Sequence, residues 1–191
     1  MIRLRTGFIE PDLVVDIKKI PELMHLSFDP AKGLRLGAAV PSTKIYGDKK
    51  ISAAYSALSD SARIIGGWQI QTRASIGGNL CNSSPAADSI PSLSALDAKC
   101  EIAGPQGPRT VSAAEFCTAP GRNVLKQGEI LVALTFAAPA PRSGSKYLRF
   151  IPRNEMDIAV VGVGAWVQLN ASGSAVEAAR ISLGAVAPTP L

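Results

Sequence analysis

The alternation of apolar and polar positions along this chain predicts a sheet-rich fold with helices between the strands. Five runs with period-two alternation or many β-branched residues are expected to form strands: residues 13–17, 129–137, 146–151, 158–169 and 178–186. Two hairpins are expected, joining residues 25–28 with 34–40 and residues 99–103 with 109–111. Because the last three strands alone would leave one sheet face uncovered, helices or a partner are expected to pack on it.

Helical spacing of apolar residues predicts a helix over residues 50–65, which ends at the glycine pair Gly66 and Gly67. The next stretch, residues 68–87, has no periodicity and is rich in Gly, Ser, Asn and Pro. Because ~20 residues is long for a plain connector, this stretch is expected to be a functional loop. Asp88 stands where a helix N-cap would stand, and that helix is expected to run to about residue 98.

Composition agrees with a globular chain and excludes several classes of function. Hydrophobic residues make up 47% of the 191 residues and charged residues 18%, so the chain can bury a core. The net charge of +5 comes from scattered basic residues that form no stripe for a phosphate backbone, so no nucleic acid is expected. The longest apolar run, residues 158–167, is shorter than the ~18 residues that suggest a membrane span, so none is expected.

The residues that usually bind metals or act as nucleophiles are few. The three cysteines, Cys81, Cys100 and Cys117, form no C-x-x-C pair, so no zinc or iron–sulfur site is expected in this chain. A Ser-His-Asp triad would have to use the single histidine, His25. Because His25 lies in an alternating, strand-like run, a structural role is favoured for it.

The sequence Ser75-Ile76-Gly77-Gly78-Asn79 is the best candidate for chemistry. Paired glycines allow positive φ angles and close approach of the backbone to another group. Successive amides in such a turn form a concave anion site, to which Ser75 and Asn79 can add side-chain donors. The spacing matches neither a Walker loop nor a dinucleotide fingerprint. Spacing alone therefore leaves two readings open, a pyrophosphate cradle and a tight loop between packed elements.

The surrounding residues resemble a known family. Residues 65–88 look like the flavin-binding signature of the molybdenum hydroxylases, above all of the FAD-carrying medium subunit of bacterial carbon monoxide dehydrogenase and xanthine dehydrogenase-type enzymes. Residues 75–80 and 82–88 together form the specific part of that signature. Further matches follow in order at residues 115–116, 121–122, 128–131, 149–153, 157–159 and 183–190. The resemblance covers essentially the whole chain.

The resemblance implies an α+β fold in two parts. Residues 1–138 would be an FAD-binding domain of the PCMH type, the fold shared with vanillyl-alcohol oxidase relatives. Residues 145–191 would be an incomplete α+β C-terminal domain of the carbon monoxide dehydrogenase flavoprotein type, with an antiparallel sheet. The family also has a first glycine-rich loop before the strand expected at residues 13–17. Residues 1–5 look like the helix just after that loop, so the chain is expected to lack the loop and to stop before the last covering helices.

The resemblance also assigns roles to single residues. Ser75, Ile76, Gly77, Gly78 and Asn79 would hold the pyrophosphate and the adjoining ribityl chain of FAD. Asp88 would contact the cofactor, Leu131 would lie near the isoalloxazine edge, and Arg149 would stand beside the flavin.

Each of the last three residues also has an ordinary reading. Asp88 fits a helix N-cap, and one carboxylate can serve both purposes. Leu131 fits the core of a strand, and Arg149 fits a solvated charge on a strand.

The implied reaction is electron transfer, with no covalent nucleophile supplied by this chain. A molybdopterin-containing large subunit would hydroxylate the substrate, and a 2Fe-2S small subunit would pass the electrons to FAD. FAD would hand them to NAD⁺, a quinone or oxygen. Because no apolar signal region follows Met1, the protein is expected in the cytoplasm.

Two alternatives stay open at this point. One is a truncated structural fragment that binds FAD weakly or not at all. The other is a stand-alone flavin reductase of the same superfamily.

Overall fold

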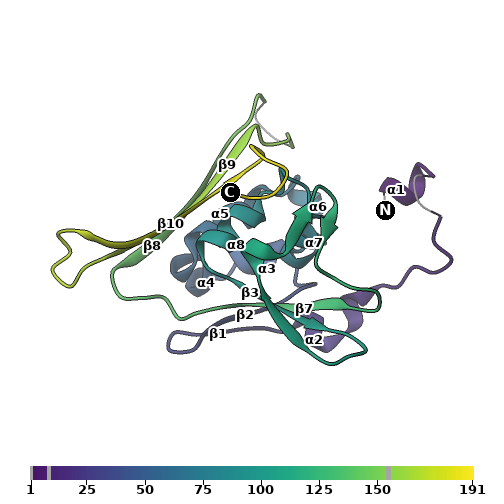
Figure 1. The fold of residues 1–191 in the computed structure, drawn as a ribbon, viewed down its shortest axis with the longest axis horizontal. Coiled ribbons are helices and arrows are strands. Elements are labelled where there is room, and N and C mark those ends of the chain that lie inside the picture. Colours follow the sequence, from purple (N-terminus) through teal and green to yellow (C-terminus); the bar gives the residue numbers. More distant parts are fainter. Residues whose placement is uncertain (1, 8–9, 154–155) are drawn as a thin grey trace.

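A layer of short helices lies between two antiparallel sheets in this protein (Figure 1). The computed structural model describes residues 2–7, 10–153 and 156–191. The larger sheet has five strands in the order β1-β2-β7-β3-β4, and the smaller has three in the order β10-β9-β8. The predicted α+β class is confirmed.

The five-stranded sheet comes from the middle of the chain. Its strands are β1 (Leu26–Asp29), β2 (Gly33–Gly37), β3 (Lys99–Ala103), β4 (Arg109–Ser112) and β7 (Ile130–Phe136). Both predicted hairpins are confirmed, with Leu26 opposite Leu36 and Cys100 opposite Val111. The 3₁₀ helix η2 (Ala113–Glu115) and the small ribbon of β5 (Cys117–Ala119) and β6 (Arg122–Asn123) connect β4 to β7.

The helix expected over residues 50–65 is two helices, α4 (Lys49–Ala54) and α5 (Ser56–Ile64). The break is at Tyr55, whose backbone leaves the helical region at φ −131° and ψ 63°. The Tyr55 side chain is buried, and its hydroxyl donates a hydrogen bond of 2.7 Å to the carbonyl of Ala137. The helix break therefore coincides with a tertiary hydrogen bond to the residue that follows β7, where local spacing predicts one continuous helix.

The irregular loop expected at residues 68–87 is wrong as secondary structure, because this stretch holds two short helices; its functional role stays a prediction. The two helices are α6 (Trp68–Gln71) and α7 (Ile76–Asn82), and α3 (Ser42–Tyr46) and α8 (Ser89–Ala95) complete the layer. In α7 the fully buried side chains Ile76 and Leu80 are one turn apart. Two buried positions in seven residues are too few to produce a visible period.

The N-terminal part differs from the expectation as well. No strand forms over residues 13–17, where Leu13 is 77% exposed; the 3₁₀ helix η1 (Ile17–Lys19) begins instead, capped by Asp16. Among the described residues this segment pairs with no other strand, and β propensity alone does not make a sheet. Helix α1 (Ile2–Arg5) stands apart from the rest (Figure 1), and Met1 lies outside the described residues. Helix α2 (Pro21–Met24) leads into β1.

The three predicted C-terminal strands are confirmed as β8 (Ser143–Phe150), β9 (Val161–Leu169) and β10 (Val176–Gly184). Their inner face packs against α5 and α8. Their outer face exposes large apolar side chains, among them Leu148, Phe150 and Ile181. No described helix is long and apolar enough to cross a membrane.

Candidate functional site

The N-terminal turn of α7 carries four of the predicted site residues. Ser75 is its N-cap, and its Oγ accepts a hydrogen bond of 3.1 Å from the amide of Gly78. The expectation of positive φ at Gly77 and Gly78 is wrong, because both residues are helical. Close approach does require Gly77, since a Cβ there would lie 2.5 Å from the carbonyl oxygen of Ala38. The turn is therefore packed on the protein on one side, while Gly78 is exposed on the other.

Asn79, the fifth residue of this group, links α7 to the start of α8. Its Oδ1 accepts hydrogen bonds from the amide of Ser89 at 3.3 Å and from the Ser89 hydroxyl at 2.6 Å. An acceptor for the first amide of α8 is thus supplied from another helix. This arrangement leaves the neighbouring Asp88 side chain available for other contacts.

Asp88 does not cap α8, which corrects the N-cap reading. It occupies the N-cap position with helical backbone angles, φ −59° and ψ −31°, and makes no side-chain capping bond. Its carboxylate instead accepts hydrogen bonds from Arg149 Nη1, at 3.2 Å to Oδ1 and 3.1 Å to Oδ2. The hydroxyl of Tyr147 donates to Oδ1 at 3.0 Å. Two side chains of β8 therefore converge on one carboxylate.

The ion pair between Asp88 and Arg149 is nearly buried, with side-chain exposures of 12% and 10%. The reading of Arg149 as a solvated strand charge is therefore wrong. Burial raises the pKa of Asp88 above its usual value, and the Arg149 charge and the two hydrogen bonds act in the opposite direction. A buried carboxylate needs such partners, because an unpaired buried charge costs several kcal/mol, on the order of 3–5 when one partner is removed.

Leu131 lies in β7, opposite Ile102, and is buried in the hydrophobic core. The structure thus supports its ordinary role as core of a strand, and its contact with a cofactor stays a prediction. The strand that carries Leu131 is connected to α7 through one intermediate residue, Ala38. The carbonyl of the next residue, Val132, accepts the amide of Ala38, and Ala38 is the residue that packs on Gly77.

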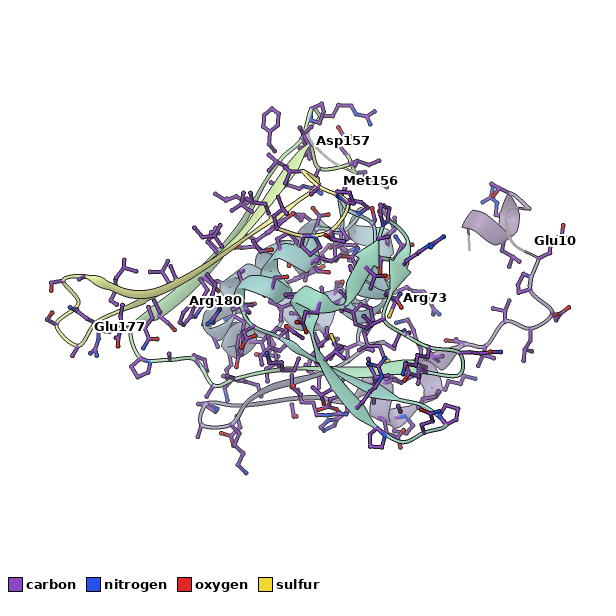
Figure 2. The ribbon with its side chains drawn as sticks, viewed as in Figure 1. Glu10, Arg73, Met156, Asp157, Glu177 and Arg180 are labelled. Atoms are coloured by element: carbon purple, nitrogen blue, oxygen red, sulfur yellow. The ribbon has the colours of Figure 1, made fainter. Side chains whose placement is uncertain are left out.

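A cavity of about 580 Å³ opens beside Arg149. It is lined by Tyr46, Arg63, Ile64, Gly66, Gly67, Trp68, Gln71, Arg149 and Met156. Trp68 lies at the edge of the cavity and is 69% exposed. Met156, in the connection between β8 and β9, lies close to Gly67. Figure 2 shows Met156 and Asp157 in this connection, above the helical layer. The cavity combines an aromatic ring, glycine backbone and two guanidinium groups, which suits a planar, anionic molecule.

Sequence reasoning missed Tyr147, Trp68 and Met156. A signal for Tyr147 exists, because it is two residues before Arg149 on the same strand and must share its face. Trp68 and Met156 line the same cavity through the tertiary fold, and no local pattern predicts that they share it.

The residues present fit a flavin dinucleotide. The amides in the first turn of a helix have no acceptor within the helix, which suits phosphate oxygens, although in α7 the Gly78 amide is already bonded to Ser75 Oγ. The exposed Gly78 leaves backbone accessible at this turn, where a Cβ would lie 3.1 Å from Ser75 Oγ. Beyond it, the polar groups Asp88 and Arg149 and the cavity beside them offer a site for the rest of the molecule.

No group of cysteine, histidine and carboxylate side chains that could bind a metal occurs among the described residues. Cys81, Cys100 and Cys117 are free thiols. Burial raises the pKa of Cys81 to about 11 and that of Cys100 to about 12, so these thiols are protonated and unreactive near neutral pH.

Comparison with known families matches both parts of the chain. Residues 1–139 match the family described as the FAD binding domain in molybdopterin dehydrogenase. Residues 146–191 match the CO dehydrogenase flavoprotein C-terminal domain.

Individual relatives agree with this match. The chain is 36% identical over 179 residues to a putative xanthine dehydrogenase FAD-binding subunit of Escherichia coli, covering 93% of this chain and 61% of that protein. It is 31% identical over 192 residues to the carbon monoxide dehydrogenase medium chain of Hydrogenophaga pseudoflava, covering 100% of this chain and 64% of that protein. The chain thus spans less than two thirds of the length of these relatives.

A solved structure gives the same answer. Carbon monoxide dehydrogenase from Hydrogenophaga pseudoflava superposes with a TM-score of 0.91 at 28% identity, over 99% of this chain and 64% of that one. The predicted family, its fold and its flavin cofactor are confirmed by these matches. The chain belongs to the family of FAD-binding domains of the molybdopterin dehydrogenases.

Proposed function

We propose that this chain binds FAD and acts as the flavin subunit of a molybdenum hydroxylase. One observation carries the proposal: residues far apart in the sequence, Asp88 and Arg149, form a buried ion pair next to the capped turn of α7. The family match over residues 1–139 supports FAD as the molecule held there.

Each of the predicted site residues would contact a different part of the cofactor. The first turn of α7, from Ser75 to Asn79, would hold the pyrophosphate and the ribityl chain of FAD. Arg149, fixed by Asp88, would place a positive charge beside the flavin, and Leu131 would lie near the ring edge. FAD, when bound, would accept electrons and pass them on, while the protein supplies binding, orientation and electrostatics.

The partners and the route of the electrons are part of the proposal. The relatives are named as FAD-binding or medium subunits of dehydrogenases, which fits a division of labour among chains. A molybdopterin-containing large subunit and a 2Fe-2S small subunit would deliver the electrons, and NAD⁺, a quinone or oxygen would receive them. We place the complex in the cytoplasm and divide this chain into domains at residues 1–138 and 145–191.

The first test is FAD binding by the purified 191-residue chain. We expect the chain to bind FAD, as measured by flavin absorption after gel filtration and by titration of flavin fluorescence. The double variant Asp88→Asn with Arg149→Gln removes both charges but keeps polar groups in place. We expect it to bind FAD at least tenfold more weakly, equal to about 1.4 kcal/mol.

The control is the double variant Arg35→Gln with Glu101→Gln. It removes a more exposed ion pair, of 2.8 Å, on the opposite face of β2 and β3 from the core. We expect it to leave FAD affinity unchanged. A wild-type chain that is colourless and indifferent to FAD would contradict the proposed function and favour a purely structural fragment.

A further inference from the structure

Strand β8 presents two donors to the carboxylate of Asp88. Tyr147 and Arg149 are two residues apart and so share the inner face of the strand. The Tyr147 hydroxyl donates to Oδ1 at 3.0 Å, and Arg149 Nη1 lies 3.2 Å from the same oxygen and 3.1 Å from Oδ2. Tyr147 and Arg149 therefore both donate a hydrogen bond to Oδ1 of Asp88.

The fold provides a space for this hydroxyl. Tyr147 is only 3% exposed. A Cβ on Gly162, in the neighbouring strand β9, would lie 2.5 Å from the Tyr147 hydroxyl oxygen. Real Cβ atoms do not approach an oxygen so closely, so any other residue at 162 would displace the phenol.

The backbone of Tyr147 is fixed from a second side. Its amide donates a hydrogen bond of 3.3 Å to Oδ2 of Asp60, a residue of α5. The side chain thus leaves a strand bound to α5 and ends at the start of α8. Such a position between two helices leaves the hydroxyl little freedom to choose another partner.

The charges around the contact between Tyr147 and Asp88 determine whether the hydroxyl keeps its proton. Burial and the nearby Asp88 charge raise the pKa of Tyr147, so the phenol stays protonated and donates. A neutral donor stabilises the Asp88 carboxylate without adding a net charge. Arg149 is then the cation of the group, and its second contact, 3.5 Å to the carbonyl of Asp157, keeps it at the edge of the cavity.

We infer that Tyr147 is a positioning residue of the flavin site: its hydroxyl fixes the Asp88 carboxylate, which in turn holds Arg149 in one orientation. This inference rests on the proposed function. It assigns a role to a residue of the C-terminal sheet that touches the cofactor only through others.

The variant Tyr147→Phe removes one oxygen atom and keeps the ring. Asp88 then loses the donor that fixes its carboxylate, so Arg149 is no longer held in one orientation beside the cavity. Less positive charge remains for the flavin, so the reduced, anionic form should lose more binding than the oxidised form. We expect a tenfold greater loss for reduced FAD, which lowers the two-electron midpoint potential by about 30 mV.

The matched control is Tyr55→Phe. Tyr55 is equally buried at 3% exposure, and its hydroxyl donates to a backbone carbonyl, that of Ala137, with no link to Asp88. Both variants lose one buried tyrosine hydroxyl, so their thermal unfolding should change similarly. Only Tyr147→Phe should change the affinity for FAD and the potential. Equal effects of the two variants on affinity, with no shift in potential, would overturn the inference.

A second variant separates packing from hydrogen bonding. Gly162→Ala together with Tyr147→Phe places a methyl group near the space of the missing hydroxyl, 3.2 Å from the ring carbon Cζ, so the ring must shift by a few tenths of an ångström. We expect this double variant to unfold at a temperature near that of the wild type and to keep the full loss of FAD affinity and the lower potential. A double variant that binds FAD like the wild type would show that packing alone matters. A wild-type chain that binds no FAD would overturn the proposed function, and this inference with it.

Discussion

Among single residues, Glu129 accepts a dense set of hydrogen bonds outside the candidate site. Its carboxylate accepts Arg109 Nε at 2.8 Å, Arg109 Nη2 at 2.7 Å and the amide of Lys126 at 2.7 Å. Bidentate arginine–carboxylate pairs of this kind are the stronger class of ion pair. The hydrogen bonds from Arg109, and next that from Lys126, lower the pKa of Glu129 to about 2.

This shift predicts how stability depends on pH. The unfolded chain holds Glu129 at its ordinary pKa of about 4.3, so the pair stabilises the fold fully above that pH. The contribution is lost as pH falls toward about 2. We expect Glu129→Gln to unfold at lower urea than the wild type at pH 7, and the two midpoints to converge between about pH 4.5 and pH 2. The exposed Glu115→Gln is the control, and a constant gap for Glu129→Gln would contradict the assignment.

For single residues, the sequence indicated Asp88 and Arg149 as members of one site but gave the wrong hydrogen-bond partner for Asp88. The motif placed Asp88 and Arg149 in one site by resemblance, and the structure brings the two side chains together. The N-cap expected for Asp88 failed because Asn79 accepts the first amide of α8 instead. Capping preference is a local rule, and a side chain from another helix is invisible to it.

Among the elements, α7 depends on the space that Gly77 leaves. A Cβ there would lie 2.5 Å from the Ala38 carbonyl oxygen and 2.7 Å from its Cα, and backbone atoms cannot easily move. Although alanine favours helices by up to ~1 kcal/mol, we expect Gly77→Ala to destabilise the protein by roughly 1–3 kcal/mol in urea unfolding.

The neighbouring variant Gly78→Ala is the matched control. Its Cβ would face solvent and approach only Ser75 Oγ, at 3.1 Å. We expect a change of less than ~1 kcal/mol in either direction. Equal destabilisation by both substitutions would mean that helix propensity, rather than the contact with Ala38, decides the stability of α7.

Elements with many alternating residues could be predicted, and those fixed by tertiary contacts could not. The hairpins and the C-terminal strands follow from local alternation, since each strand pairs with its neighbour in sequence. Tyr55 breaks a helix by bonding to Ala137, 82 residues away, which no window of sequence contains. Residues 13–17 have the composition of a strand but find no partner among the described residues.

For the whole molecule, the decisive feature is how the three-stranded sheet packs on the helical layer. Arg149 and Asp88 are 61 residues apart and meet only because this sheet lies on α8. Neither composition nor periodicity predicts such packing; only the resemblance placed both residues at one cofactor. The glycines of β9 are the sequence feature that permits it, because a larger residue at Gly164 would collide with Pro91 of α8 and one at Gly162 with the Tyr147 hydroxyl.

Gly164 tests this packing directly, because a Cβ on it would collide with the backbone of Pro91 in α8. We expect Gly164→Ala to destabilise the protein by at least roughly 1–3 kcal/mol. Hydrogen exchange should speed up in β8–β10 before the five-stranded sheet, because the helical layer lies between the two sheets. The control Gly144→Ala lies in the same sheet with open space around its Cβ and should change stability by less than ~0.5 kcal/mol. If exchange rose equally in both sheets, the C-terminal sheet would be an inseparable part of one cooperative unit, and the loss of the Asp88–Arg149 pair would require unfolding of the whole chain.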